Sequence, residues 1–238
     1  MNTTHIFLCA TCDSLEADNN MNGPIPAEIG NLEAMERLVL STNCLVGTMP
    51  PEMGLLSNLQ VLDLQSNGLS GYVSDEFFDL SMLVSLNISY QYSNWENCTS
   101  SDGDVIEPFY QMGDPDNDEN NGLEGNFLEK IGRLQYLKEV NLDQNSFVGS
   151  ISTEIGNLLE LGKFLMHVSI KAWILFHPIQ LAIFSEFLST GGNFFNGTIP
   201  EAMPTKLREL WMSTNDFSGP LPESIGNLTS LRECFKAY

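Results

Sequence analysis

The stretch Asn43–Leu64, NCLVGTMPPEMGLLSNLQVLDL, carries leucine, asparagine, glycine and proline at offsets that return along the chain. The asparagine recurs after 24, 24 and 22 residues in the pairs Asn43 and Asn67, Asn121 and Asn145, and Asn193 and Asn215. Recurrence at a fixed period is the sequence signature of a repeat protein, in which each unit buries its apolar face against its neighbours. The sequence therefore predicts one elongated array with a long, thin core.

Each position of the repeat has a physical role. Alternating leucines such as Leu62 and Leu64 predict a short strand with one face in the core, and stacked copies predict a parallel sheet. Glycines such as Gly47 permit a tight bend, and Glu28–Leu32 predicts a return leg with one turn of helix or 3₁₀ helix. An asparagine that follows each strand can bond unpaired backbone groups of its own turn and of the neighbouring turn. We therefore expect an amide ladder formed by Asn43, Asn67, Asn145, Asn193 and Asn215.

The pattern NxLxGxIPxEIGxLxxL, present at residues 19–35, 145–161 and 215–231, resembles the plant-type leucine-rich repeat. The resemblance implies an α/β repeat solenoid, a curved right-handed superhelix with a concave parallel β-sheet, a 3₁₀ or helical convex side and a small second sheet. It also implies kinship with receptor-like ectodomains and polygalacturonase-inhibitor-like proteins. Such proteins bind a protein, a peptide or a small ligand on the inner face.

Two interruptions divide the array. We expect a poorly patterned segment at 1–18, repeats at 19–91, an acidic insertion loop at 92–120, repeats at 121–162, an apolar insertion or degenerate repeat at 163–187, and repeats without a C-terminal cap at 188–238. The acidic loop resembles the opening of a calcium site at Asp114, Asp116 and Asp118. Glu119 and Gly125 replace the glycine and the glutamate that such a site requires, so we expect no metal.

The apolar segment Lys163–Glu186 is long enough to suggest a membrane span. Because the repeats resume at Leu188, a span would place two halves of one solenoid on opposite sides of a bilayer, and we expect none. Its 24 residues equal one repeat. One explanation is a degenerate repeat whose template positions are Phe164, Met166, Ser169 and Ile179. The explanation we favour is translated non-repeat sequence, such as a retained intron whose length is a multiple of three.

The chain has 31 acidic and 10 basic residues, and no cluster of Lys and Arg. We therefore expect neither nucleic acid nor anionic lipid as a partner, because both require basic clusters that neutralise phosphates. The five cysteines are scattered at Cys9, Cys12, Cys44, Cys98 and Cys234, a pattern that defines no disulfide framework and favours buried or idle thiols.

N-x-S/T sequons suit a secreted protein. They stand at Asn2, Asn87, Asn97, Asn196 and Asn227, and the last four are the candidate glycosylation sites. We expect an extracellular or cell-surface location, with the cytoplasm as the alternative.

The sequence contains no HExxH, no GxSxG elbow and no glycine-rich phosphate loop, so we expect neither enzyme activity nor a cofactor. A concave sheet with freely variable outward positions favours recognition of a protein or peptide ligand. The outward residues expected to bind are Arg37, Val39, Ser41, Asp63, Gln65, Asn87, Tyr90, Glu139, Asn141, Asp143, Glu209, Trp211 and Ser213. A structural or adhesive surface protein and a cytosolic scaffold are the alternatives, and the oligomeric state stays open.

If the apolar segment is not part of the repeat array, its removal restores the template spacing. A deletion of Lys163–Glu186 should then unfold in urea at no lower a concentration than the full chain does. A deletion variant that does not fold would contradict the insertion hypothesis.

Overall fold

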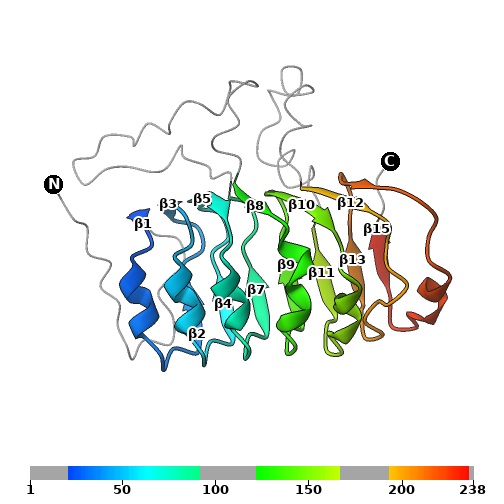
Figure 1. Cartoon of the computed structure of the whole chain (residues 1–238), viewed down its shortest axis with the longest axis horizontal. Helices are drawn as coiled ribbons and strands as arrows, with labels where there is room; N and C mark the ends of the chain where they lie inside the picture. Colours follow the sequence, from blue (N-terminus) through cyan, green and yellow to red (C-terminus); the bar gives the residue numbers. More distant parts are fainter. Residues whose placement is uncertain (1–20, 92–121, 167–192, 236–238) are drawn as a thin grey trace, which may run out of the picture.

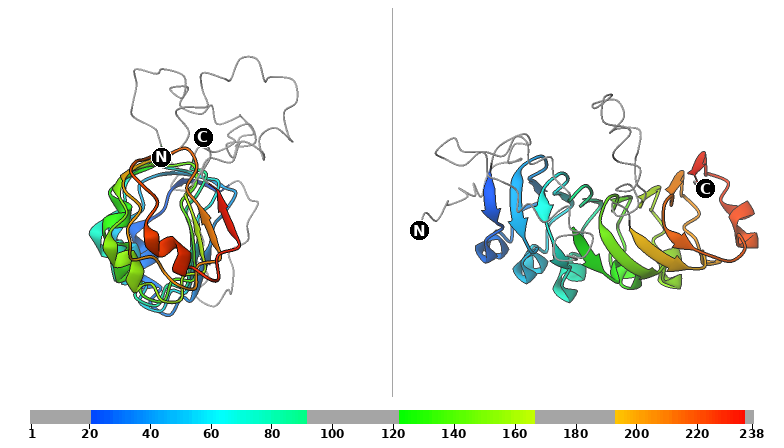
Figure 2. Two further views of the ribbon diagram at one scale, coloured as in Figure 1. Left: turned by 90° about the vertical axis from the view of Figure 1, so that its right-hand side faces the viewer. Right: turned by 90° about the horizontal axis from the view of Figure 1, so that it is seen from above.

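The computed structural model describes residues 21–91, 122–166 and 193–235. Figures 1 and 2 show turns of a solenoid stacked along one axis, with a large sheet on one side and short helices on the other. One strand from each turn enters the large, seven-stranded parallel sheet. In order, its strands are β2 (Arg37–Val39), β4 (Val61–Asp63), β7 (Ser85–Asn87), β9 (Glu139–Asn141), β11 (Lys163–Leu165), β13 (Glu209–Trp211) and β15 (Glu233–Phe235).

A second set of strands follows the bend after each of these strands. A three-stranded parallel sheet contains β1 (Asn22–Pro24), β3 (Cys44–Gly47) and β5 (Gly68–Leu69). A five-stranded parallel sheet contains β6 (Gly71–Tyr72), β8 (Leu123–Gly125), β10 (Ser146–Ser150), β12 (Phe194–Gly197) and β14 (Asp216–Phe217). The second sheet implied by the plant-type pattern is therefore present, in two sections.

The return leg of most turns is a 3₁₀ helix, as predicted, whereas the described residues 198–208 between β12 and β13 contain none. These helices are η1 (Ala27–Asn31), η2 (Pro51–Leu55), η3 (Asp75–Asp79), η5 (Phe127–Glu129), η6 (Ile131–Arg133), η7 (Thr153–Asn157) and η9 (Glu223–Asn227). The glycine within the helix lets adjacent turns approach closely. A Cβ atom on Gly54 would lie 2.1 Å from the backbone oxygen of Glu76, and one on Gly30 would lie 2.5 Å from that of Glu52. The spacing of the convex side therefore requires glycine at these two positions.

The core is a continuous column of leucines joined by stacked phenylalanines. The central residue of each strand in the large sheet pairs in register with the central residue of the next, as in Leu38, Leu62 and Leu86. The aromatic rings of Phe77, Phe78, Phe127, Phe147 and Phe195 form a chain with centroid separations of 5.1 to 6.1 Å. The rings on either side of residues 92–121 are in direct contact, so the core continues across this break.

The amide ladder joins each turn to the one before it. Asn67 Nδ2 donates to Leu64 O (3.0 Å) in its own turn and to Leu40 O (2.9 Å) in the preceding turn, while its Oδ1 accepts from Leu45 N (3.1 Å). The longer side chain of Gln91 bonds the corresponding groups, including Leu64 O at 2.9 Å. Asn145 and Asn215 make the same three kinds of bond farther along the stack. Asn43 accepts from Met21 N and donates to Leu40 O in its own turn, and Asn193 accepts from Phe147 N and donates to Leu142 O in the preceding turn.

The ladder locates the second interruption within the fold. Asn215 Nδ2 donates to Met166 O (2.7 Å) just as Asn193 Nδ2 donates to Leu142 O (2.7 Å). Leu142 stands three residues before its ladder residue Asn145, whereas Met166 stands 27 residues before Asn193. The 24 excess residues therefore lie after β11, between Met166 and Asn193.

Residues at the start of the apolar segment belong to the repeat. Phe164 and Met166 are fully buried at leucine positions of the template, as the degenerate-repeat explanation requires. Ser169 and Ile179 of that explanation lie outside the described residues, as do segment 1–18 and the acidic loop at 92–120. In the described ranges, no helix is long and apolar enough to cross a bilayer.

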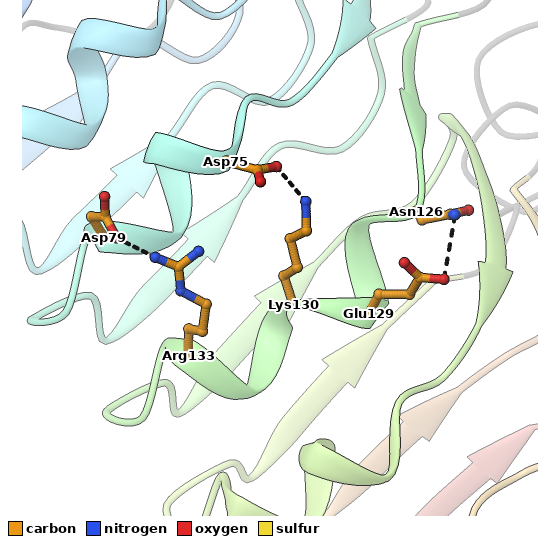
Figure 3. Close-up of polar contacts among 6 residues, drawn as sticks. All are labelled: Asp75, Asp79, Asn126, Glu129, Lys130 and Arg133. Atoms are coloured by element: carbon orange, nitrogen blue, oxygen red, sulfur yellow. Dashed lines mark hydrogen bonds and ion pairs between the residues drawn. The ribbon is translucent and has the colours of Figure 1, made fainter.

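Ion pairs join the two turns that flank each interruption. Figure 3 shows Lys130 with Asp75 and Arg133 with Asp79, which join η3 to the segment that contains η5 and η6 across residues 92–121. The hydrogen bond and the charge of Lys130 hold the pKa of Asp75 below its ordinary value. The second interruption is spanned by two further pairs, Lys206 with Glu160 and Lys163 with Glu209. Every ion pair between two described residues therefore crosses an interruption.

Cys44 corrects the expectation of idle thiols. It is buried in β3 and is disulfide-bonded, and its partner is not among the described side chains. A disulfide forms and persists in oxidising compartments, so this bond carries information about location that the spacing of the cysteines did not.

The position of the excess residues leads to a comparison of two deletions of equal length. Removing 167–190 keeps Met166 in the core, whereas removing Lys163–Glu186 places Thr190 at the same template position. A buried hydroxyl is less favourable than a packed methionine, so we expect the first variant to be more stable by about 1–3 kcal/mol. Urea denaturation of the two purified variants measures the difference, and the reverse order would contradict this placement.

The concave face as a candidate binding site

The large sheet presents two rows of side chains because its strands are only three residues long. The central residue of each strand points into the core, so the first and the third residues point away from it. The first row contains Arg37, Val61, Ser85, Glu139, Lys163, Glu209 and Glu233. Among the side chains that the structure describes, the second row contains Val39, Asp63, Asn87, Asn141, Leu165 and Trp211.

A hollow of about 370 Å³ lies on this face over the five strands β2, β4, β7, β9 and β11. It brings together six of the residues expected from the sequence, namely Arg37, Val39, Asp63, Asn87, Glu139 and Asn141. It also contains Lys163 and Leu165, which the sequence analysis assigned to the apolar insertion. Their signal was the run Leu161-x-x-Phe164-x-Met166, which fits the leucine template with phenylalanine and methionine in place of leucine.

Four of the expected binding residues occupy other environments. Ser41, Asp143 and Ser213 are only 9%, 2% and 7% exposed, because each follows a strand at the point where the chain turns back into the body of the repeat. Tyr90 lies in the turn after β7 with φ of 56°, not on the strand. The expectation that Ser41, Asp143 and Ser213 project from the concave sheet is therefore wrong, whereas the role of half-buried Tyr90 in binding stays a prediction.

Three other expected residues flank the hollow. Gln65 is half-buried beside it, and its Oε1 accepts a hydrogen bond from Asn87 Nδ2 (2.7 Å). Glu209 and Trp211 lie on β13, directly beside Lys163 and Leu165 in the register of the sheet. The second row therefore continues past the hollow as an apolar surface.

The polar part of the second row is held in place by the backbone. The Oδ1 atoms of Asp63, Asn87 and Asn141 each accept a hydrogen bond from the backbone N–H two residues later, at 3.1, 3.4 and 3.0 Å. Asn87 Oδ1 accepts a second bond, from Ser89 Oγ (2.7 Å). Both amide atoms of Asn87 are thus hydrogen-bonded, whereas Asn141 Nδ2 has no hydrogen-bond partner among the described residues. Asp63 and Asn141 are therefore the second-row groups available to a ligand.

Asp63 is a half-buried carboxyl group that lines the hollow. Burial raises the pKa of its carboxyl, and hydrogen bonds from the backbone of Gln65 and the side chain of Ser41 offset this only in part. No described cation lies within ion-pair range of it. Lys163 Nζ is instead 3.4 Å from Glu209, and Arg37 and Glu139 are exposed and form no ion pair with a described residue.

The described ranges contain no group of three His, Cys, Asp or Glu side chains that could hold a metal ion. The calcium-like run Asp114–Asp118 lies outside them. Among the sequons, Asn196 on β12 and Asn227 in η9 are exposed, and Asn97 is outside the described residues. Asn87 lines the hollow, so a glycan there and a ligand there would compete for one space.

Comparisons with known proteins agree with this architecture. Three segments, residues 58–80, 136–158 and 206–228, match the family described as Leucine Rich Repeat. The Arabidopsis receptor kinase HAESA, solved with the peptide hormone IDA and the co-receptor SERK1, is similar with a TM-score of 0.67 and 24% identity, over 94% of this chain and 29% of that one. The plant peptide hormone receptor RGFR1, solved with RGF2, gives a TM-score of 0.59 and 23% identity over 91% and 30% of the two chains.

A plant ice-binding protein is also similar, with a TM-score of 0.51 and 19% identity over 93% of this chain and 62% of that one. At these identities the likeness concerns the fold. The chain spans less than a third of the length of the receptors, from 26% to 30% of the first four. No curated protein shows significant sequence similarity to it.

The burial of Asp63 predicts a stabilising substitution. Because the folded-state pKa is raised, the ionised carboxylate opposes folding, and stability is lost as the pH rises through that pKa. Asp63→Asn retains an acceptor for Gln65 N and matches the residues found at this position on β7 and β9. We expect it to raise the free energy of unfolding at pH 7 by up to about 1 kcal/mol, and the gain to vanish at low pH, where Asp63 is protonated.

Urea denaturation at pH 7 and at about pH 3.5 measures this difference. Asp216→Asn, at an exposed aspartate of β14, is the matched control and should change little at either pH. A variant Asp63→Asn that is less stable than the parent chain at neutral pH would show that burial does not dominate at this site.

Proposed function

We propose that this chain, a leucine-rich-repeat protein of the plant type, is a non-catalytic recognition module that binds a protein or peptide on its concave face. The observation that carries the proposal is the open hollow over five adjacent strands, lined mostly by side chains that the core does not use. In a stacked-repeat architecture these outward positions can change without disturbing the leucine column behind them. That independence suits a surface dedicated to recognition.

Two further observations support this function. The solved receptors with a similar fold, HAESA and RGFR1, are complexes with the peptide hormone IDA and with RGF2. The hollow combines apolar side chains, such as Val39 and Leu165, with a small number of placed polar groups, such as Asp63 and Asn141. This combination is typical of ligand sites, in which apolar contacts supply affinity and polar groups set orientation.

We also place the protein outside the cell or at its surface, as part of a receptor-like or inhibitor-like protein. The disulfide bond of Cys44 requires an oxidising compartment to persist. The exposed sequons at Asn196 and Asn227 are compatible with the same compartment. A structural or adhesive protein would share the fold and the compartment, but it would not need an open hollow that can hold a ligand.

A substitution that fills the hollow tests the proposal. Ser85 lies on β7 at the middle of the hollow, and Ser85→Trp would occupy much of the space without altering the core. Peptides selected from a random display library on the parent chain should bind this variant at least about tenfold more weakly. Binding is measured by fluorescence anisotropy with the selected peptides.

Ser81→Trp is the matched control, because Ser81 is exposed in the same repeat but on the convex side after η3. It should bind the selected peptides as the parent chain does. If the library yields no peptide, or if both tryptophan variants bind equally well, the concave face is not a peptide site.

A further inference from the structure

We infer that the peptide bound on this face carries a cationic side chain, seated against Asp63, and an apolar side chain about four residues away, seated on Leu165 and Trp211. This inference rests on the proposed function and specifies the chemistry and spacing of its ligand. It follows from a change of character along the second row, from an aspartate and two asparagines to a leucine and a tryptophan.

The first half of the row favours a cation. Asp63 is a half-buried carboxylate whose position is fixed by the backbone N–H of Gln65 (3.1 Å), and the described protein supplies no positive charge to it. Burial raises the pKa of this carboxyl, which means that the unliganded fold does not fully stabilise its charge. An ammonium or guanidinium group from a ligand would supply the missing interaction. Glu139, exposed two strands away on the first row, adds a second negative charge to the hollow as a whole.

The two basic residues of the hollow do not reverse this preference. Lys163 is paired with Glu209 at 3.4 Å, so its charge is neutralised within the sheet. Arg37 lies at the edge of the sheet on β2, where its side chain is exposed. The two rows together contain four carboxylates, Asp63, Glu139, Glu209 and Glu233, against these two cations. The face is therefore acidic, in keeping with the net charge of −21.

The second half of the row favours an apolar side chain. Leu165 lines the hollow from β11, and Trp211 continues the row on β13. Both are half-buried, so part of each side chain is accessible. Removing apolar surface from water contributes about 25 cal/mol per Å², and tryptophan is among the residues most often found as an interface anchor. An aliphatic or aromatic side chain of the ligand would be held here.

The geometry of the sheet sets the distance between the two subsites. Asp63 on β4 and Leu165 on β11 are separated by three inter-strand steps, and neighbouring strands lie about 4.8 Å apart, which gives about 14 Å. An extended peptide that crosses the strands rises about 3.3 Å per residue, so about four residues span this distance. Adjacent cationic and apolar residues could not reach both subsites.

The experiment uses a random display library selected on the parent chain, on Asp63→Asn and on Leu165→Asn. Asparagine occupies the same register position on β7 and β9, so both substitutions suit the local backbone. Asp216→Asn and Leu221→Asn, at exposed positions away from the concave face, are the matched controls. Circular dichroism and urea denaturation establish that each variant is folded.

Peptides selected on the parent chain and on both controls should be enriched in Lys or Arg separated by about four residues from Phe, Leu or Trp, in either order along the peptide. Selection on Asp63→Asn should lose the cationic preference alone, and selection on Leu165→Asn should lose the apolar preference alone. For one selected peptide, replacing its cation with glutamine should weaken binding to the parent chain at least about fivefold and leave binding to Asp63→Asn unchanged.

The outcomes separate the inference from the function on which it rests. Selected peptides that lose binding to Ser85→Trp but lack this spacing, or whose cation preference survives in Asp63→Asn, would overturn the inference and leave peptide recognition intact. A library that yields no peptide at all would contradict the proposed function itself.

Discussion

The stacking of the repeats depends on the hydrogen bonds of the amide ladder. Where each strand ends, the backbone turns and leaves carbonyl and N–H groups that the parallel sheet does not pair. Asn67 bonds two such carbonyls, in its own turn and in the preceding one, and accepts an N–H bond from Leu45. Leaving a buried polar group unpaired costs about 1–3 kcal/mol, so a turn that lost its amide would destabilise both neighbours. The ladder therefore sets the register of the whole array.

Close packing on the convex side also fixes the spacing of adjacent turns. Gly54 approaches the backbone of the next turn more closely than any side chain permits, and the phenylalanine chain fills the space between turns. With both sides of each repeat held at fixed spacing, side chains that leave the concave strands have little freedom of direction. A rigid sheet with replaceable outward residues is the arrangement on which recognition by this fold depends.

The interruptions show how the array tolerates added sequence. The ladder continues through Gln91 to Asn145 and from Met166 to Asn215, so the extra residues leave the hydrogen-bond pattern intact. The ion pairs between Lys130 and Asp75 and between Lys206 and Glu160 join the turns on either side of each break. Exposed ion pairs of this kind contribute little individually, because solvent screens their charges. Their placement at the breaks is consistent with a role in register instead of bulk stability.

The sequence by itself determined the repeat, the parallel sheet, the glycine bends and the amide ladder, because each depends on residue types at short, constant offsets within one turn. The tertiary structure alone decided which outward residues share the hollow. Lys163 and Leu165 enter it because Phe164 and Met166 fill the leucine positions beside them, and Ser41 and Asp143 leave it because the chain turns inward directly after the strand. These outcomes depend on how adjacent turns pack against one another, and the residue spacing within a single repeat does not determine that packing.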